Sequence, residues 1–130
     1  MATQRLQGVK ILLAEDDPDL RECIAESLSL QGADVVSAEN GAKALELFAR
    51  EPVDIVLSDY RMPGGDGLTF LRAVRANNPG HPPFVFLSGY SDISTADALK
   101  EGAQCFLHKP CDFREIAEHL LSVLKKTREQ

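Results

Sequence analysis

Acidic side chains and one lysine stand at the ends of short apolar segments, where they could act on phosphate. Asp59 closes one apolar run, Glu15 and Asp16 follow another, and Ser88 and Lys109 stand at the ends of two more. A carboxylate beside a divalent cation can act as a nucleophile toward phosphorus. A lysine can neutralise charge on the transferring oxygens, and a hydroxyl can donate a hydrogen bond to the attached group. These residue types suit a phosphoryl-transfer site, provided that the fold brings them together.

Five short apolar segments alternate with five helical patterns along the chain. The predicted strands cover residues 9–14, 34–38, 54–58, 84–88 and 104–108. Most of them are apolar throughout rather than alternating, which favours strands that are covered on both faces. Strict alternation of strands and helices is typical of a parallel sheet between two helical layers. We therefore predict a doubly wound α/β fold with five parallel strands.

Capping residues indicate where the helices begin and end. Asp17 precedes Pro18, which suits the first helical position because its missing N–H costs nothing there. We favour this capping role for Asp17 over metal ligation, and Gly32 is placed to end the helix. Further N-caps are predicted at Asn40, Asp66 and Asp112, the last as part of a capping box with Glu115.

Helical spacing also predicts which side chains face the sheet. In the first helix these are Leu20, Cys23, Ile24, Ser27, Leu28 and Gln31; in the second, Leu45, Phe48 and Ala49; in the third, Leu68, Leu71 and Val74. In the last they are Phe113, Ile116, Ala117, Leu120, Leu121 and Leu124. The fourth, about 92–101, offers only Ile93, Ala96 and Leu99, so it is anchored weakly and could serve as a bistable element.

The carboxyl ends of parallel strands meet at one edge of a doubly wound sheet, so the five polar residues named first should converge. Taken singly, each has an ordinary explanation as solvated charge, a turn residue or a loop residue. Their joint placement at the ends of four strands favours a site. Two carboxylates 4 Å apart repel by about 4 kcal/mol at an effective dielectric of 20, and a divalent cation removes that cost. Oxygen ligands without His or Cys suit Mg²⁺, and Mn²⁺ accepts the same set.

Length, charge and cysteine usage restrict the class of protein. The 130 residues, 44% of them hydrophobic, suit one domain with a single packed core. A net charge of −6, with no basic cluster before Lys125-Lys126, argues against direct nucleic-acid binding. The three cysteines form no CxxC pair, so neither a disulfide framework nor a zinc site is expected, and we place them in or near the core. Neither a signal peptide nor a membrane-spanning run is recognisable, which predicts a cytoplasmic protein without membrane contact.

Five segments together resemble the receiver domain of two-component response regulators. They are residues 12–18, 39–45, 54–67, 86–90 and 102–110. The resemblance runs from about Val9 to Leu124 and implies a single receiver domain over residues 1–130. It also implies a flavodoxin-like (βα)5 fold with strand order 2-1-3-4-5. The implied function is that of a phosphorylation-controlled switch and not of an enzyme.

The resemblance assigns a role to each polar residue at the sheet edge. It implies that Asp59 accepts a phosphoryl group from a histidine kinase or histidine phosphotransfer protein. Glu15, Asp16 and Asp59 would hold Mg²⁺ together with the backbone carbonyl of Arg61. Arg61 and Tyr90 would flank the path of water to the phosphorylated aspartate, which leaves the lifetime of the modified state open.

The same resemblance implies how a signal would leave the site. Ser88 takes the position of the hydroxyl switch and Lys109 that of the family's lysine. Phe106 takes the position of the rotating aromatic, where many receivers carry Tyr, so coupling here would rest on ring packing. The altered surface would be read by a downstream protein or by a fused output or kinase domain. The segment 88–92 resembles receivers that are joined to histidine kinases or transcription factors.

Three other classes of protein use related residues or a related fold. A phosphatase of the haloacid dehalogenase-like kind would carry Asp-x-Asp after its first strand, where this chain has Glu15, Asp16 and Asp17. A degenerate receiver that works without phosphorylation would be expected to lack an acid or the lysine, and none is missing. A flavin-binding flavodoxin-like protein needs a phosphate loop after the first strand, and acids there would repel phosphate.

Overall fold

The five strands lie in one parallel sheet, in the order β2-β1-β3-β4-β5. This computed structural model describes residues 5–63, 66–89, 95–109 and 111–128. The strands are β1 (Lys10–Ala14), β2 (Asp34–Ala38), β3 (Ile55–Asp59), β4 (Phe84–Ser88) and β5 (Cys105–His108). The doubly wound sheet and its strand order are as expected from the sequence, and each strand begins and ends within one residue of its predicted bounds.

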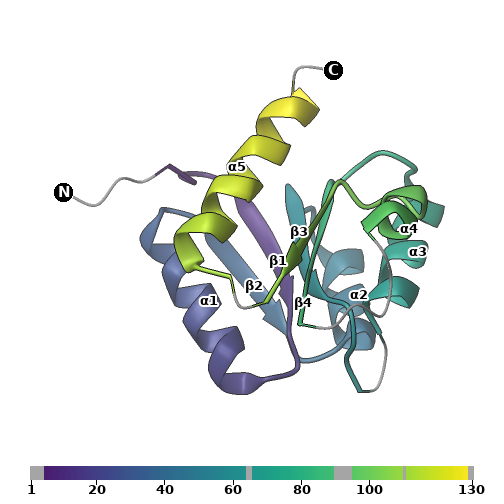
Figure 1. The fold of residues 1–130 in the computed structure, drawn as a ribbon, viewed down its shortest axis with the longest axis horizontal. Helices are drawn as coiled ribbons and strands as arrows, with labels where there is room; N and C mark the ends of the chain where they lie inside the picture. Colours follow the sequence, from purple (N-terminus) through teal and green to yellow (C-terminus); the bar gives the residue numbers. More distant parts are fainter. Residues whose placement is uncertain (1–4, 64–65, 90–94, 110, 129–130) are drawn as a thin grey trace.

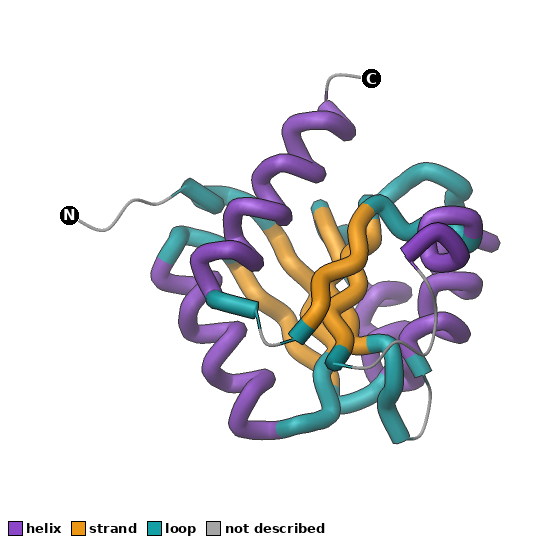
Figure 2. Tube along the Cα trace, in the orientation of Figure 1, coloured by secondary structure: helices purple, strands orange, loops and turns teal. Residues whose placement is uncertain are grey.

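Helices cover both faces of the sheet (Figure 1). They are α1 (Pro18–Leu30), α2 (Gly41–Arg50), α3 (Gly67–Asn77), α4 (Thr95–Lys100) and α5 (Phe113–Arg128). Helices α1 and α5 pack on one face around one hydrophobic cluster, and α2, α3 and α4 pack on the other around a second (Figure 2). In β1, Ile11 and Leu13 contribute to the first cluster, whereas Leu12 and Ala14 contribute to the second. This two-sided burial explains why the strands are apolar throughout.

The predicted N-cap residues are confirmed, but the capping box of Asp112 with Glu115 is not, because the Glu115 carboxylate accepts from Cys111 Sγ. The Asp17 carboxylate accepts hydrogen bonds from two amides of the first turn of α1, at 3.0 and 3.3 Å. Asn40, Asp66 and Asp112 each accept one from an amide two or three residues further on, at 2.8 Å. Gly32, with φ +96°, follows the end of α1 in a conformation that side chains disfavour. These local signals fix where helices α1, α2, α3 and α5 begin.

Two of the predicted inward positions in α2 are wrong. Leu45 is 37% exposed and Ala49 is exposed, whereas Ala44 is fully buried. Phe48 is half-buried against the second cluster, beside Leu47. A small residue faces the sheet here, so Leu45, one residue and about 100° further round the helix, points outward.

Helix α4 also presents a different residue to the core from those predicted. Ala98 is fully buried, whereas Ala96 is exposed and Leu99 is 47% exposed, so the inward assignment of both was wrong. Ile93, the third predicted position, lies outside the described residues. A six-residue helix offers too few positions for periodicity to select a face, and among its described side chains the Ala98 methyl group belongs to the second cluster.

Helices α1, α3 and α5 are largely as predicted. In α3, Leu71 and Val74 are buried and Leu68 is half-buried, but the fully buried Phe70 was missed. In α5 the predicted stripe is buried or half-buried throughout. Cys23 in α1 was expected in or near the core and is exposed, because it lies beside the buried Ile24 on the outer side of the helix.

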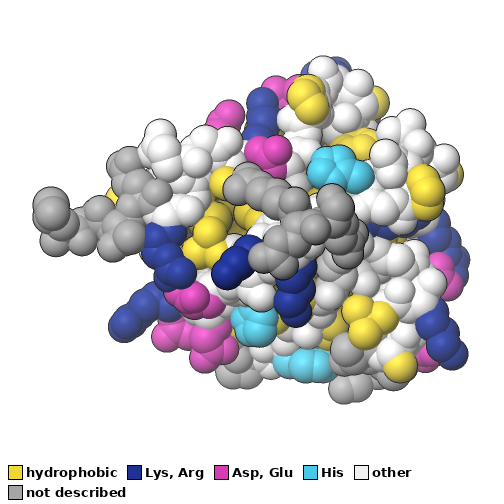
Figure 3. All heavy atoms as spheres, turned by 90° about the horizontal axis from the view of Figure 1, so that it is seen from above, with side chains coloured by type: hydrophobic (Ala, Val, Ile, Leu, Met, Phe, Trp, Pro, Cys, Tyr) yellow, Lys and Arg dark blue, Asp and Glu magenta, His cyan; other side chains and the backbone are white. Residues whose placement is uncertain are grey.

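The amino ends of the strands carry charges of both signs. Lys10 in β1 forms salt bridges with Glu51 and Asp34, and its amide donates to the Asp54 carboxylate at 2.8 Å. Figure 3 views the molecule from this end and shows acidic and basic side chains interspersed. Among the described residues, we find no helix with the length and apolar character needed to cross a bilayer.

Candidate functional site

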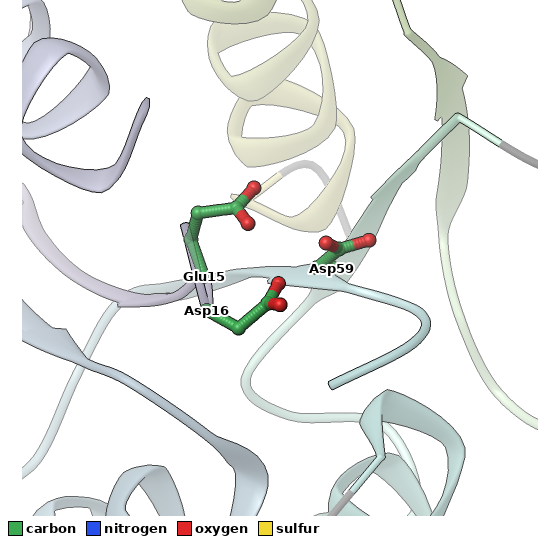
Figure 4. Close-up of side chains that lie close together, drawn as sticks. All are labelled: Glu15, Asp16 and Asp59. Carbon is green, nitrogen blue, oxygen red and sulfur yellow. The ribbon is translucent and has the colours of Figure 1, made fainter. Parts of the chain in front are cut away.

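Three carboxylates from two strand ends converge at the carboxyl edge of the sheet (Figure 4). Glu15, Asp16 and Asp59 each place one oxygen within 4.8 Å of the others. Strands β1 and β3 are neighbours with Ala14 opposite Ser58, so the residues that follow these two lie side by side. Glu15 is 1% exposed and Asp59 is 8% exposed, whereas Asp16 is exposed. The cluster therefore has two buried acids and one that faces solvent.

Lys109 joins the two buried acids. Its Nζ donates to Glu15 Oε1 at 2.9 Å and to Asp59 Oδ2 at 3.2 Å. Its amide donates to the Ser88 carbonyl at 2.9 Å, which extends the pairing of β4 and β5 to the edge of the sheet. The sequence predicted that Lys109 would reach this edge of the sheet. In the structure it lies there and pairs with both buried carboxylates.

The two oxygens of the Asp59 carboxylate have different neighbours. Oδ1 accepts a hydrogen bond from the Tyr60 amide at 2.8 Å, and Oδ2 faces Lys109. The Ser58 hydroxyl donates to the Asp59 carbonyl at 2.8 Å, which holds the backbone at the end of β3. The side chain is thereby fixed in direction, with its carboxylate toward an open cleft of about 960 Å³ that Arg61 also lines.

The pKa values of Glu15, Asp59 and Lys109 are all shifted from their ordinary values. Burial raises the pKa of Glu15 to about 7, against the opposing effect of the Lys109 hydrogen bond. It also raises the pKa of Asp59, again opposed by Lys109. Burial by itself lowers the pKa of Lys109, but hydrogen bonds and attraction from both acids more than offset it, so this pKa is raised. One lysine is too little positive charge for this set of acids.

The free energy of unfolding of the metal-free protein should therefore fall as pH rises from about 4.5 to about 7. Over that range Glu15 retains its proton in the folded state but has lost it in the unfolded chain. A rise in pH therefore stabilises the unfolded state relative to the folded state. We expect a decrease on the order of 2 kcal/mol between pH 5 and pH 8. Urea unfolding with chelator, compared with Glu15→Gln, measures the effect. An equal pH dependence in both proteins would contradict it.

Ser88 and Phe106 lie on the two strands that follow β3 in the sheet, Ser88 at the end of β4 and Phe106 in β5. Asp59 pairs with Leu87 in the sheet, so Ser88 follows at the same edge, and it is 1% exposed. Phe106 is 7% exposed and packs on Phe86, with ring centroids 5.8 Å apart. Its ring belongs to the cluster under α2, α3 and α4, on the face that carries the buried Ala98 of α4.

Two contacts to Glu15 were not predicted from the sequence. The Arg21 guanidinium donates to the Glu15 carbonyl at 2.8 Å, and the Asp17 amide donates to the Glu15 carboxylate at 3.2 Å. Arg21 lies four residues after the N-cap Asp17, and this spacing on the first turn is the signal that could have suggested it. Asp17 itself has the capping role that the sequence favoured.

Comparison with known proteins agrees with this geometry. The family described as response regulator receiver domain matches residues 11–121. The response regulator protein PilR of Pseudomonas aeruginosa is 38% identical over 89% of this chain and 26% of its own length. The DNA-binding transcriptional regulator NtrC of Escherichia coli is 32% identical over 92% of this chain and 26% of its own length. The solved receiver domain of Francisella response regulator 1452 superimposes with a TM-score of 0.84, at 29% identity, covering 92% of this chain and 99% of that one.

This chain belongs to the family of response regulator receiver domains. Members of this family are the phosphoacceptor modules of two-component signalling systems. The chain spans about a quarter of the length of the two curated relatives, 26% in each case.

Proposed function

We propose that Asp59 is the residue that accepts the phosphoryl group. The observation that carries this proposal is the position of its carboxylate, which is held 3.2 Å from Lys109 and beside Glu15 and Asp16 at the base of an open cleft. Glu15 also contacts Lys109, but it is 1% exposed against 8% for Asp59, so Asp59 is the more accessible of the two buried carboxylates. Asp59 is therefore the buried acid best placed to react.

The carboxylate cluster fits a Mg²⁺ ion, with Mn²⁺ as an alternative. Its oxygens lie within 4.8 Å of one another, and oxygen-only ligands suit these cations. Glu15, Asp16 and Asp59 would be ligands, and the Arg61 backbone carbonyl would complete the protein's share. When bound, the ion would supply positive charge to the acids and to the phosphoryl oxygens. The raised pKa of Glu15, about 7 in the metal-free cluster, supports this, because repulsion from Asp59 is the largest effect after burial that raises it.

Lys109 and Ser88 would stabilise the phosphorylated state. The Lys109 ammonium already contacts Asp59 Oδ2, so it is placed to pair with an oxygen of the attached group. The Ser88 hydroxyl would turn toward the same group and donate a hydrogen bond. Phosphorylation adds about −1.5 to −2 charge and three acceptor oxygens, so both donors gain a stronger partner than the carboxylate.

The signal would leave through Phe106. When Ser88 moves toward the phosphoryl group, the Phe106 ring would fill the vacated space and alter the surface formed by α4, β5 and α5. Reversing a 99:1 resting equilibrium needs about 5.5 kcal/mol of differential stabilisation, and smaller differences give graded responses. Phe106 has no hydroxyl, so its contacts with Phe86 would carry this coupling.

The partners follow from this role. We propose a histidine kinase or a histidine phosphotransfer protein as the phosphodonor in the cytoplasm. The altered surface would act on a separate target protein or on an output or kinase domain of the same polypeptide. The domain itself would act as a switch without turnover of an external substrate, and it would contact neither nucleic acid nor membrane directly.

Intact-protein mass after incubation with a small phosphodonor tests the proposal. With Mg²⁺ we expect a gain of one phosphoryl group, and with chelator no gain. Asp59→Asn should abolish the gain, because an amide cannot act as the nucleophile, whereas Asp19→Asn, an exposed acid of α1, should leave it unchanged. A gain of equal size in Asp59→Asn would show that another residue is the acceptor.

A further inference from the structure

We infer that Arg21 is a positioning residue for the cation site, holding the Glu15–Asp16 peptide group in the orientation that metal binding requires. The inference deepens the proposed function and rests on it. The Arg21 side chain is half-buried, and its Nη1 donates to the Glu15 carbonyl at 2.8 Å. That carbonyl belongs to the peptide group that joins the two acids, so its rotation would change the direction of both side chains.

The other groups around this peptide are also anchored. The Glu15 amide donates to the Ala38 carbonyl at the end of β2, at 3.0 Å. The Glu15 carboxylate accepts from the Asp17 amide at 3.2 Å and from Lys109 at 2.9 Å. Asp16 is exposed and lies between these anchored groups. Arg21 contributes the contact to the carbonyl side of the Glu15–Asp16 peptide.

Helix α1 brings Arg21 back over the loop. The Arg21 amide donates to the Asp17 carbonyl at 2.8 Å, which places Arg21 one turn after the N-cap. Side chains of a helix lean toward its N-terminus, so a long residue at this position reaches the preceding loop. The planar guanidinium offers several donors in a fixed geometry, whereas a lysine would offer a more mobile single ammonium.

Charge alone would have the opposite effect to positioning. Arg21 carries a positive charge near a site for a divalent cation, so its electrostatic effect disfavours the ion. Removing the charge without any loss of geometry would therefore strengthen Mg²⁺ binding. Loss of a group that orients a metal ligand typically weakens affinity by 10- to 100-fold. The direction of the change in affinity distinguishes the two roles.

Calorimetric titration of the full chain with Mg²⁺ tests the inference. We expect Arg21→Met to weaken binding about tenfold or more, and Arg21→Lys to recover part of the loss because an ammonium can still donate to the Glu15 carbonyl. Arg50→Met removes an exposed cation at the end of α2 and should leave affinity unchanged. Urea unfolding without Mg²⁺ establishes that each variant is folded; if Arg21→Met is not, Arg21→Lys decides, with binding weaker than wild type expected.

The outcomes separate this inference from the proposal it rests on. Binding by Arg21→Met as tight as or tighter than that of wild type would overturn the positioning role while leaving the Mg²⁺ site in place. Binding by Arg21→Lys equal to wild type, where Arg21→Met does not fold, would overturn it equally. Failure of the wild type to bind Mg²⁺ would overturn the proposed cation site and the role of Arg21 together.

Discussion

Lys109→Met is expected to slow phosphorylation of Asp59 about a hundredfold while leaving Mg²⁺ affinity equal to or higher than that of wild type. Lys109 Nζ lies 3.2 Å from Asp59 Oδ2, where it can pair with a phosphoryl oxygen as charge develops on it. Loss of a single positioned donor of this kind typically costs a factor of 10² to 10³ in rate. The same ammonium competes with a cation for Glu15 and Asp59, so its removal favours the ion.

This separation of rate from affinity is the informative part of the experiment. The rate is measured by intact mass against time with a small phosphodonor at saturating Mg²⁺, and the affinity by calorimetric titration. Lys125→Met, an exposed lysine of α5, is the matched control and should change neither quantity. If Lys109→Met were phosphorylated at the wild-type rate, the lysine would have a structural role in the metal-free cluster only.

The carboxyl edge of the sheet could be predicted from the sequence because topology alone determines it. Once five apolar strands alternate with helices, the residues after each strand must meet at one edge, as Glu15 and Asp59 do. The caps at Asp17, Asn40 and Asp66 were predictable for a related reason, since each depends on backbone amides within three residues. Local rules and strand order together located the acids of the site and Lys109.

Contacts that depend on packing between elements could not be predicted in the same way. Periodicity identified an apolar face of α2, but the face that packs is the one with Ala44, because close approach to the sheet favours a small side chain there. Helix α4 is too short for periodicity to decide, and Ala98 was missed. The Arg21 contact with the Glu15 carbonyl was missed because it depends on the spacing of Arg21 from the N-cap and not on residue type alone.

The turn that follows Asp59 is closed by a residue without a side chain. A Cβ on Gly67 would lie 2.2 Å from the Asp59 carbonyl oxygen and 2.9 Å from Phe86 Cε1. The Gly67 amide also donates to the Tyr60 carbonyl at 2.8 Å, so the first turn of α3 packs directly on the backbone of the site. Gly67 does not have a positive φ, so close approach is the reason why glycine is needed here.

Gly67→Ala is accordingly expected to lower the free energy of unfolding by about 3 kcal/mol or more, because the atom that must yield belongs to the backbone. The same displacement would move Asp59 and weaken Mg²⁺ binding. Urea unfolding and Mg²⁺ titration measure the two effects. Gly80→Ala is the control, since a Cβ there meets nothing within 4 Å, and it should be neutral or stabilising by up to about 1 kcal/mol. Equal stability of Gly67→Ala and wild type would show that the turn after Asp59 shifts at little cost, and the phosphoacceptor could not then depend on it for its position.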